Sequence, residues 1–151
     1  MSVTSNVDLM EYAKQLYLPL HEIVTKDQLP SQLHNGCYII NMQNETAGDG
    51  THWVSLYIEN GNGVFFDPFG LSPPTSIQKR FEHKLIYSSQ QIQSIRRGYC
   101  GMYCIMFCHF MCSHKKRHPS LQHRLNLFQK IFDKDDLVGN EKRLKYYLGL
   151  K

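Results

Sequence analysis

The sequence predicts an α+β domain, in which helices pack against a central mixed sheet that is rich in antiparallel pairs. Three observations lead to this prediction: strand-like runs gather in the middle of the chain, one long apolar segment follows them, and amphipathic helical segments lie at both ends. The chain has 151 residues, of which 42% are hydrophobic and 20% are charged. These values are typical of one globular domain, so we predict a single domain over residues 1–151.

The strands are predicted from hydrophobic and β-branched runs. Residues 36–42 read GCYIINM, which is typical of a buried strand, and residues 52–59 read HWVSLYIE, in which two faces alternate. The sequence NGNG at 60–63 is a strong signal for a hairpin turn. Residues 64–67 are then the return strand, which ends at Pro68. Two further short strands are predicted, at 84–87 and 91–93.

Helical spacing of apolar residues predicts the flanking helices. Residues 7–18 form the first predicted helix, and residues 20–33, which show no clear period, are expected to be irregular. Near the other end, residues 120–132 have a clear amphipathic pattern. Asn140 is a predicted N-cap for a last helix at 141–148, because asparagine is a favoured residue at that position.

The apolar segment from Cys100 to about Cys112 predicts a buried helix that begins at a cysteine. The first turn of a helix presents unpaired N–H groups and a partial positive charge, and both stabilise a thiolate. A cysteine that only fills a core has no need of this position. Cys100 is therefore a candidate nucleophile.

The predicted hairpin places a histidine and an acid at the same end of the sheet. His52 opens one strand and Asp67 closes the strand paired with it, so their side chains can meet as cross-strand neighbours. Such a pair can fix the imidazole tautomer and stabilise its protonated form, and His52 could then act as a base toward Cys100. Gln93, seven residues before Cys100, could place its amide beside the Cys100 backbone N–H and complete an oxyanion hole.

Taken one at a time, these residues also have ordinary structural interpretations. A histidine in a strand is usually structural, an aspartate before proline usually forms a turn, and a glutamine in a loop is usually solvated. Trp53, next to the histidine, could shield the imidazole and line the substrate cleft, or it could simply pack in the core. The hairpin geometry favours the catalytic interpretation, because the position of the turn by itself places His52 and Asp67 at the same end of the sheet.

Metal binding is the main alternative use of the cysteines. From Cys100 to Cys112 the cysteines have the spacing C-x3-C-x3-C-x3-C. Each step of four residues in a helix turns about 40° beyond a full turn, so the first and last cysteines point about 120° apart, and the helical rise separates them by ~18 Å. One straight helix cannot wrap four thiolates around one zinc ion, and a neighbouring pair would need outside ligands such as His109 or His114. We therefore predict no metal site and interpret the later cysteines as buried apolar residues.

The segments HWVSLYIENGNGVFFDPFG (52–70) and CGMYCIMFCHF (100–110), with Gln93 between them, resemble the adenovirus-type cysteine endopeptidases, the adenain family, which are related to the SUMO-deconjugating proteases. The family pattern is His-Trp, then an acid within Phe-acid-Pro-Phe-Gly, then Gln, then Cys-Gly at the head of a helix. The resemblance spans roughly residues 36–112. It implies a papain-like, adenain-like fold with a Cys-His-Asp triad and a Gln oxyanion hole.

The resemblance also implies a function. Relatives of this kind are thiol proteases of DNA viruses, and a virophage or polinton-like source fits as well. They cleave viral capsid or core precursor proteins next to glycine during particle maturation. No cofactor is required by the triad, but the resemblance implies that DNA or a short viral peptide can act as an activator. Two departures matter: the acid is Asp67 where the adenovirus enzyme has Glu, and no cysteine lies between 67 and 93 to tether such a peptide.

Charge is distributed unevenly along the chain. The net charge is +4, yet residues 115–151 contain 10 Lys/Arg and 4 Asp/Glu, which gives +6 there and −2 elsewhere. This asymmetry fits an acidic partner such as DNA, and it fits an ordinary solvated helix surface equally well. The candidate DNA contacts are Arg96, Arg97, Lys115, Lys116 and Arg117.

Several sequence features bear on location and partners. No apolar run approaches the ~18 residues of a membrane span, and the first residues lack the pattern of a signal peptide. Four of the five cysteines lie in one helix-like run, which favours free thiols in a reducing compartment. We expect a monomer inside the host cell, in a virus factory or the nucleus, that is packaged in the virion. The alternatives are a deubiquitinase or SUMO-type isopeptidase, and a basic DNA-binding module that has lost catalysis.

Overall fold

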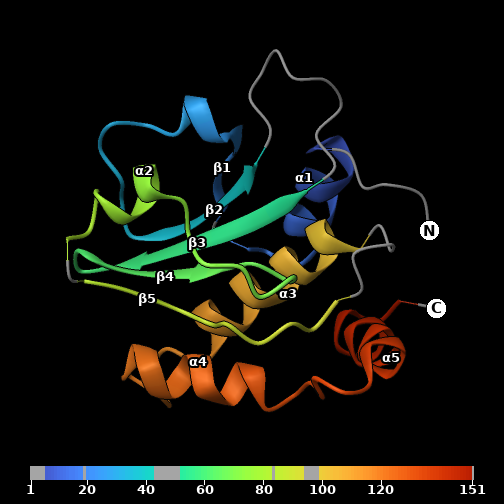
Figure 1. Ribbon diagram of the computed structural model, residues 1–151. Coiled ribbons are helices and arrows are strands. Elements are labelled where there is room, and N and C mark those ends of the chain that lie inside the picture. The colour runs from blue at the N-terminus through green and yellow to red at the C-terminus, as the bar shows by residue number, and fades with distance from the viewer. Residues whose placement is uncertain (1–5, 19, 43–51, 83, 94–98, 151) are drawn as a thin grey trace.

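The computed structural model describes residues 6–18, 20–42, 52–82, 84–93 and 99–150 (Figure 1). Within them lies a five-stranded sheet with the strand order β1-β2-β3-β4-β5. The central pairs, β2 with β3 and β3 with β4, are antiparallel, and the outer pairs, β1 with β2 and β4 with β5, are parallel. The predicted α+β class with a mixed sheet is confirmed. The strands are β1 (Leu20–Thr25), β2 (Gly36–Asn41), β3 (Trp53–Glu59), β4 (Asn62–Phe66) and β5 (Leu85–Tyr87).

The helices cover the sheet unequally. The buried helix α3 packs on β3 and β2, and α1, α4 and α5 gather around α3 on that same side (Figure 1). The opposite face is covered by α2 and nearby loops, through Ile77, Phe81 and Leu29. The helices are α1 (Asn6–Gln15), α2 (Thr75–Gln78), α3 (Cys100–Ser113), α4 (Leu121–Gln129) and α5 (Leu137–Leu148), and Lys26–Gln28 form a single turn of 3-10 helix. No helix among the described residues is both long and apolar enough to cross a membrane.

The hairpin of β3 and β4 has the predicted alternation but a tighter turn. Trp53 and Tyr57 face the core around α3, whereas Leu56 and its alternate neighbours face the core under α2. Asn60 and Gly61 alone make the turn, both with positive φ (53° and 81°), as a two-residue primed turn requires. Strand β4 therefore begins inside the predicted loop, and Glu59 pairs with Asn62.

The prediction that residues 20–33 are irregular is wrong for their first part, because Leu20–Thr25 form the edge strand β1. The strand pairs in parallel with β2, and its register shifts between Leu20 and Glu22. An edge strand buries only part of its surface and is often interrupted by a bulge. The sequence LHEIVT consequently lacks the continuous apolar pattern that marks a central strand.

The strand predicted at 91–93 is also wrong. These residues belong to no strand; instead the backbone N–H groups of Ile92 and Gln93 both donate to the carbonyl of Pro68, at 3.0 and 3.1 Å. The last helix begins earlier than predicted, with Asp136 as its N-cap accepting a hydrogen bond from the Gly139 N–H at 3.0 Å. Asn140 is not the cap.

Asn140 instead anchors α5 to the loop after β5. The side chain is fully buried, and its amide donates to the carbonyls of Ile92 at 3.1 Å and Asp133 at 2.8 Å. A buried amide with satisfied donors fixes the position of the backbone that it touches. Asn140 therefore helps to hold the loop that carries Gln93.

Candidate active site

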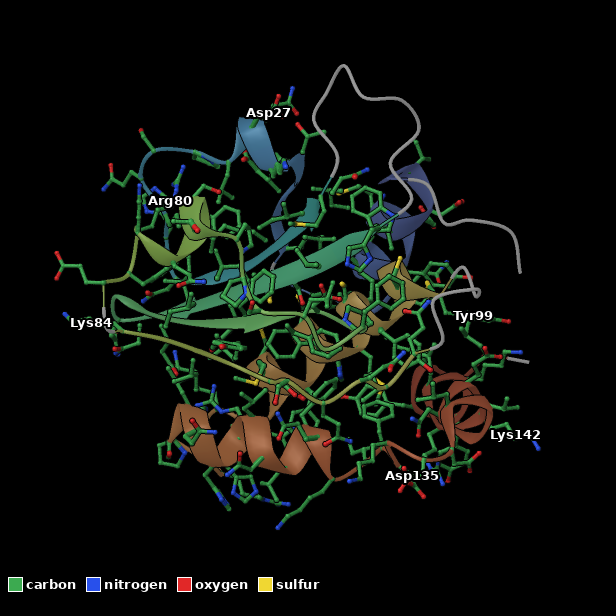
Figure 2. All side chains as sticks on the ribbon, viewed as in Figure 1. Asp27, Arg80, Lys84, Tyr99, Asp135 and Lys142 are labelled. Carbon is green, nitrogen blue, oxygen red and sulfur yellow. The ribbon has the colours of Figure 1, made fainter. Side chains whose placement is uncertain are left out.

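Three of the predicted site residues lie at one end of the sheet. His52 immediately precedes β3, Asp67 immediately follows β4, and Cys100 is the first residue of α3. Tyr99, which is labelled in Figure 2, marks this end of α3. The hairpin brings the first two together, and the packing of α3 on β3 brings the third.

His52 and Asp67 form a hydrogen-bonded pair. The Nε2–H of His52 donates to Oδ2 of Asp67 at 3.0 Å, and the Asp67 side chain is only 4% exposed. The other carboxylate oxygen, Oδ1, accepts the backbone N–H of Phe69 at 2.8 Å. Each oxygen of the carboxylate therefore has its own donor, which fixes the orientation of Asp67 and, through it, of the imidazole.

The second nitrogen of the imidazole, Nδ1, is not the one that binds Asp67. Nδ1 of His52 is buried and makes no hydrogen bond of good geometry to any residue in the described part of the chain. The Cys100 thiol nevertheless lies near enough to act on the ring.

The environment favours the protonated form of His52. Burial lowers the pKa of the ring, but the hydrogen bond to Asp67, the charge of Asp67 and the nearby Cys100 side chain outweigh the effect of burial. The interactions with Asp67 and with the nearby Cys100 side chain together raise the pKa of His52 from 6.5 to about 9. An imidazolium beside a thiol is the partner that a reactive thiolate needs.

Cys100 receives a second stabilising contact that the sequence did not reveal. Its Sγ accepts the backbone N–H of Trp53 at 3.4 Å, in addition to lying at the N-terminus of α3, where the helix dipole favours an anion. The side chain is buried, with 3% of the residue exposed. The N–H hydrogen bond fixes the position of the sulfur at the start of α3.

Phe69 is a site residue that sequence reasoning missed. Its ring stacks on the imidazole of His52 with ring centroids 4.4 Å apart and an angle of 6° between the planes. Continuing the register of β3 and β4, in which Ser55 faces Phe66, would place Phe69 opposite His52. The signal was therefore present in the hairpin pattern, since cross-strand aromatic pairs are common.

Gln93 is buried and anchored beside the acid. Its backbone N–H donates to the carbonyl of Pro68, the residue after Asp67, and its own carbonyl accepts the Gln91 side-chain amide at 3.0 Å. Gly70 lies close to the same loop, because a Cβ there would come within 2.8 Å of Gln91 N. The chain segment that precedes Gln93 is thus fixed against the end of β4.

Trp53 belongs to the main core. It is 4% exposed and lies in the cluster that includes Tyr57 and most of α3. A Cβ on Gly101 would come within 3.2 Å of the Trp53 ring and 2.8 Å of Leu9. This burial favours the core-packing interpretation that the sequence left open, while the stacked cover of the imidazole is Phe69.

Three of the five predicted DNA contacts lie among the described residues. Arg96 and Arg97 lie outside the described residues. Lys115 forms an ion pair with Glu59 at 3.4 Å, whereas Lys116 and Arg117 are exposed. These three follow the C-terminal end of α3, whereas Cys100 begins that helix. In the part of the chain that the structure describes, no group of three or more His, Cys, Asp or Glu side chains is arranged to hold a metal ion.

The chain was compared with known proteins. No protein-family model matches it, and no curated protein matches it. Among solved structures it is similar to the crystal structure of the ASFV pS273R protease, with a TM-score of 0.39 and 17% sequence identity. The match covers 76% of this chain and 44% of that chain, so this chain spans less than half the length of that protein. A likeness this distant assigns no function, and the functional proposal rests on the residues of the site.

Proposed function

We propose that the protein is a cysteine endopeptidase with Cys100 as nucleophile, His52 as proton donor and acceptor, and Asp67 as the residue that orients His52. One observation carries the proposal. A buried cysteine at a helix N-terminus lies beside an imidazole whose other nitrogen is bound to a buried carboxylate at 3.0 Å. These are the three roles of a nucleophile, a base and an orienting group.

The geometry supports a specific division of labour on the imidazole. Because Nε2 donates to Asp67, Nδ1 is the nitrogen that exchanges a proton with the reacting groups. The Cys100 thiolate attacks the scissile carbonyl carbon, and Nδ1–H protonates the departing amine as the C–N bond breaks. Nδ1 then takes a proton from water, whose oxygen attacks the thioester and releases the carboxylic acid and the Cys100 thiolate, so that the thiolate and the protonated imidazole are restored.

The negative oxygen formed during each attack needs donors. We propose that the side-chain amide of Gln93 and the backbone N–H of Cys100 supply them. The support is that Gln93 is buried and that its backbone is held at Pro68, next to Asp67. Preorganised donors of this type are typically worth ~2.7–4 kcal/mol each in the transition state.

The proposed substrates are viral structural precursor proteins cleaved next to glycine, as the sequence resemblance implies. A substrate backbone that must approach a buried thiol closely favours glycine, which has no Cβ. A peptide library varied on both sides of the cleaved bond tests this. Glycine should dominate one of the two positions before the bond, and equal cleavage after alanine, leucine and glycine would remove the preference.

The experiment that tests the proposal compares two cysteines on one helix. The unmutated protein should cleave a fluorogenic glycine-containing peptide, and Cys100→Ala should abolish cleavage while the fold stays intact. Cys104→Ala is the matched control, because Cys104 is buried one turn along α3 and should only lose packing. An inactive Cys104→Ala beside an active Cys100→Ala would contradict the assignment. Hydrolysis of a ubiquitin-like conjugate without peptide cleavage would make the protein an isopeptidase.

We further propose that DNA binds as an acidic partner. The observation that favours it is the exposure of Lys116 and Arg117 within a segment of net charge +6, counting 10 Lys/Arg against 4 Asp/Glu. Lysine and arginine side chains bind phosphates and release counterions from DNA. Binding of this type would fit a protease that acts inside a DNA-containing particle.

A further inference from the structure

Three cysteine side chains meet where β2 packs against the last turns of α3. Cys37 lies on β2 opposite Tyr57 of β3, and its thiol interacts with those of Cys108 and Cys112 on α3. Nη1 of Arg124 joins the two elements, because it donates to the Tyr57 hydroxyl at 3.5 Å and to the carbonyl of Met111, the residue before Cys112, at 3.1 Å. All three are free thiols; Cys37 and Cys108 are fully buried, whereas Cys112 is partly exposed. The cluster lies toward the end of α3 remote from Cys100, so it is separate from the proposed active site.

Two cations lie near the partly exposed thiol of Cys112. The guanidinium of Arg124 is fully buried and donates to the carbonyls of Met111 at 3.1 Å and His118 at 2.9 Å. Lys115 and Arg124 also each contact a carboxylate oxygen of Glu59 at 3.4 Å. Arg124 therefore cannot move away from this corner of the molecule, and its charge is a permanent part of the surroundings of Cys112.

The surroundings favour the Cys112 thiolate. The hydrogen bond from Cys37 lowers the pKa of Cys112, burial raises it, the charges of Arg124 and Lys115 lower it, and Glu59 raises it, with a net lowering. The pKa of Cys112 is lowered although the residue lies near the C-terminal end of α3, where the helix dipole disfavours an anion. By contrast, burial raises the pKa of Cys37, Cys104 and Cys108.

We propose that Cys112 and Cys37 form an oxidation-sensitive pair, in which Cys112 reacts with a hydroperoxide and Cys37 then closes a disulfide with it. Reactive cysteines are partly exposed and lie in electropositive surroundings, and redox-sensing ones have a second thiol nearby. Cys112 meets each condition within the described residues. The proposal does not depend on the protease function.

The chemistry balances with hydrogen peroxide or an organic hydroperoxide as the oxidant. The Cys112 thiolate attacks the terminal peroxide oxygen, the O–O bond breaks, and the other oxygen leaves as water or an alcohol after taking a proton. Cys112 is then a sulfenic acid. The Cys37 sulfur attacks the Cys112 sulfur, and the sulfenic hydroxyl leaves as water with the Cys37 proton.

The disulfide would join the start of β2 to the end of the central helix α3. It would close a long loop of the chain and thereby restrict the unfolded state more than the folded state. Oxidation should therefore raise the melting temperature. Cys100 takes no part in the bond, so the oxidised protein keeps its proposed nucleophile if that thiol is protected during treatment.

Peptide mapping of the full chain tests the pair. The protein with Cys100→Ala is treated with hydrogen peroxide, its remaining thiols are blocked with N-ethylmaleimide, and its mass and cross-linked peptides are measured. We expect a mass decrease of about 2 Da for two hydrogens before blocking, two fewer N-ethylmaleimide adducts than on the untreated protein, and a Cys37–Cys112 linked peptide. Cys112→Ala should abolish the link, and Cys104→Ala, which removes a buried thiol outside the cluster, should retain it.

Other outcomes would overturn the proposal. A Cys37–Cys108 link would show that Cys108, and not Cys112, is the reactive thiol. Accumulation of the Cys112 sulfinic acid without a disulfide would show that Cys37 does not react with the Cys112 sulfenic acid. Retention of all thiols under conditions that oxidise a free cysteine peptide would show that Cys112 is not activated. Arg124 offers no simple test variant, because its removal would leave the buried Glu59 carboxylate paired only with the exposed Lys115. Lys115→Gln removes an exposed cation instead and should slow the oxidation.

Discussion

Asp67→Asn should lower the pKa of His52 and nearly abolish catalysis, because of the way Phe69 would orient the new amide. In the unmutated protein Oδ1 of Asp67 accepts the Phe69 N–H at 2.8 Å, and Oδ2 accepts from His52 at 3.0 Å. In the Asp67→Asn variant only the side-chain oxygen, and not the NH₂ group, can accept the Phe69 N–H. The NH₂ group would then face Nε2 of His52, which would have to be unprotonated.

The magnitude follows from the state of the imidazole. Asp67 is a principal cause of the rise in the pKa of His52 from 6.5 to about 9. Without that charge, and with a donor facing Nε2, the pKa should fall to about 6.5 or below. The protonated share at pH 8 would drop from about 90% to about 3% or less. The neutral tautomer would also carry its proton on the wrong nitrogen, and the equivalent change in a serine protease lowers kcat by about 10⁴.

The assay is the pH dependence of kcat/KM on a fluorogenic peptide, together with an NMR titration of His52 in both proteins. The unmutated protein should lose activity as pH rises through about 9, and Asp67→Asn should move that alkaline limb down with the NMR pKa. Asp135→Asn is the control, because Asp135 is exposed near the start of α5 (Figure 2). An alkaline limb that stays near 9 in Asp67→Asn would refute the assignment of His52 and Asp67.

The same pair makes a prediction about stability. A histidine whose folded pKa is raised stabilises the folded state fully below its unfolded value, and that contribution is lost as pH rises through the folded value. For His52 the window runs from 6.5 to about 9. The free energy of unfolding should fall across this window in the unmutated protein more than in Asp67→Asn. Parallel curves for the two proteins would show that the pair is not coupled to folding.

Three further predictions concern the surroundings of the site. Gln93→Ala should reduce kcat by about 10²–10³ with little change in KM, and Gln91→Ala should cost less; the reverse order would refute the assignment of the oxyanion donor. Phe69→Leu removes the stacked ring and should lower both kcat/KM and the pKa of His52, whereas Phe69→Tyr keeps the ring and should retain both values. An equal loss of kcat/KM in the two variants would indicate that Phe69 has a packing role only. DNA affinity, measured by fluorescence anisotropy, should fall steeply with salt, and the double change of Lys116 and Arg117 to Ala should reduce the salt slope by about 2; no binding at ~50 mM salt would remove the DNA proposal.

Local signals explain why most of the hairpin was predictable from sequence. The alternation in β3, the Asn-Gly pair at the turn and the proline after β4 each act over a few residues. Together they place His52 and Asp67 at one end of the sheet, which is where the structure has them. The apolar segment of α3 was equally clear, because its residues are buried on nearly every side.

The remaining features depend on contacts between distant parts of the chain. The edge strand β1 is defined by its pairing with β2 rather than by its own pattern. Asn140 is of a residue type that is favoured at helix N-caps, but its side-chain amide binds the backbone carbonyl of Ile92, 48 residues away. The Trp53 N–H that reaches Cys100 and the thiols that meet at Cys37 likewise join residues far apart in sequence. No local pattern carries that information.

Labelling by a peptide electrophile tests the central claim most directly. A peptide that ends in glycine and bears a thiol-reactive group in place of the scissile bond should add once to the protein, and fragmentation should place the adduct on Cys100. His52→Ala should slow the labelling strongly, whereas Cys104→Ala should not. An adduct on Cys112 or Cys104, or labelling of Cys100 that is indifferent to His52→Ala, would contradict the claim that Cys100 and His52 form a catalytic pair.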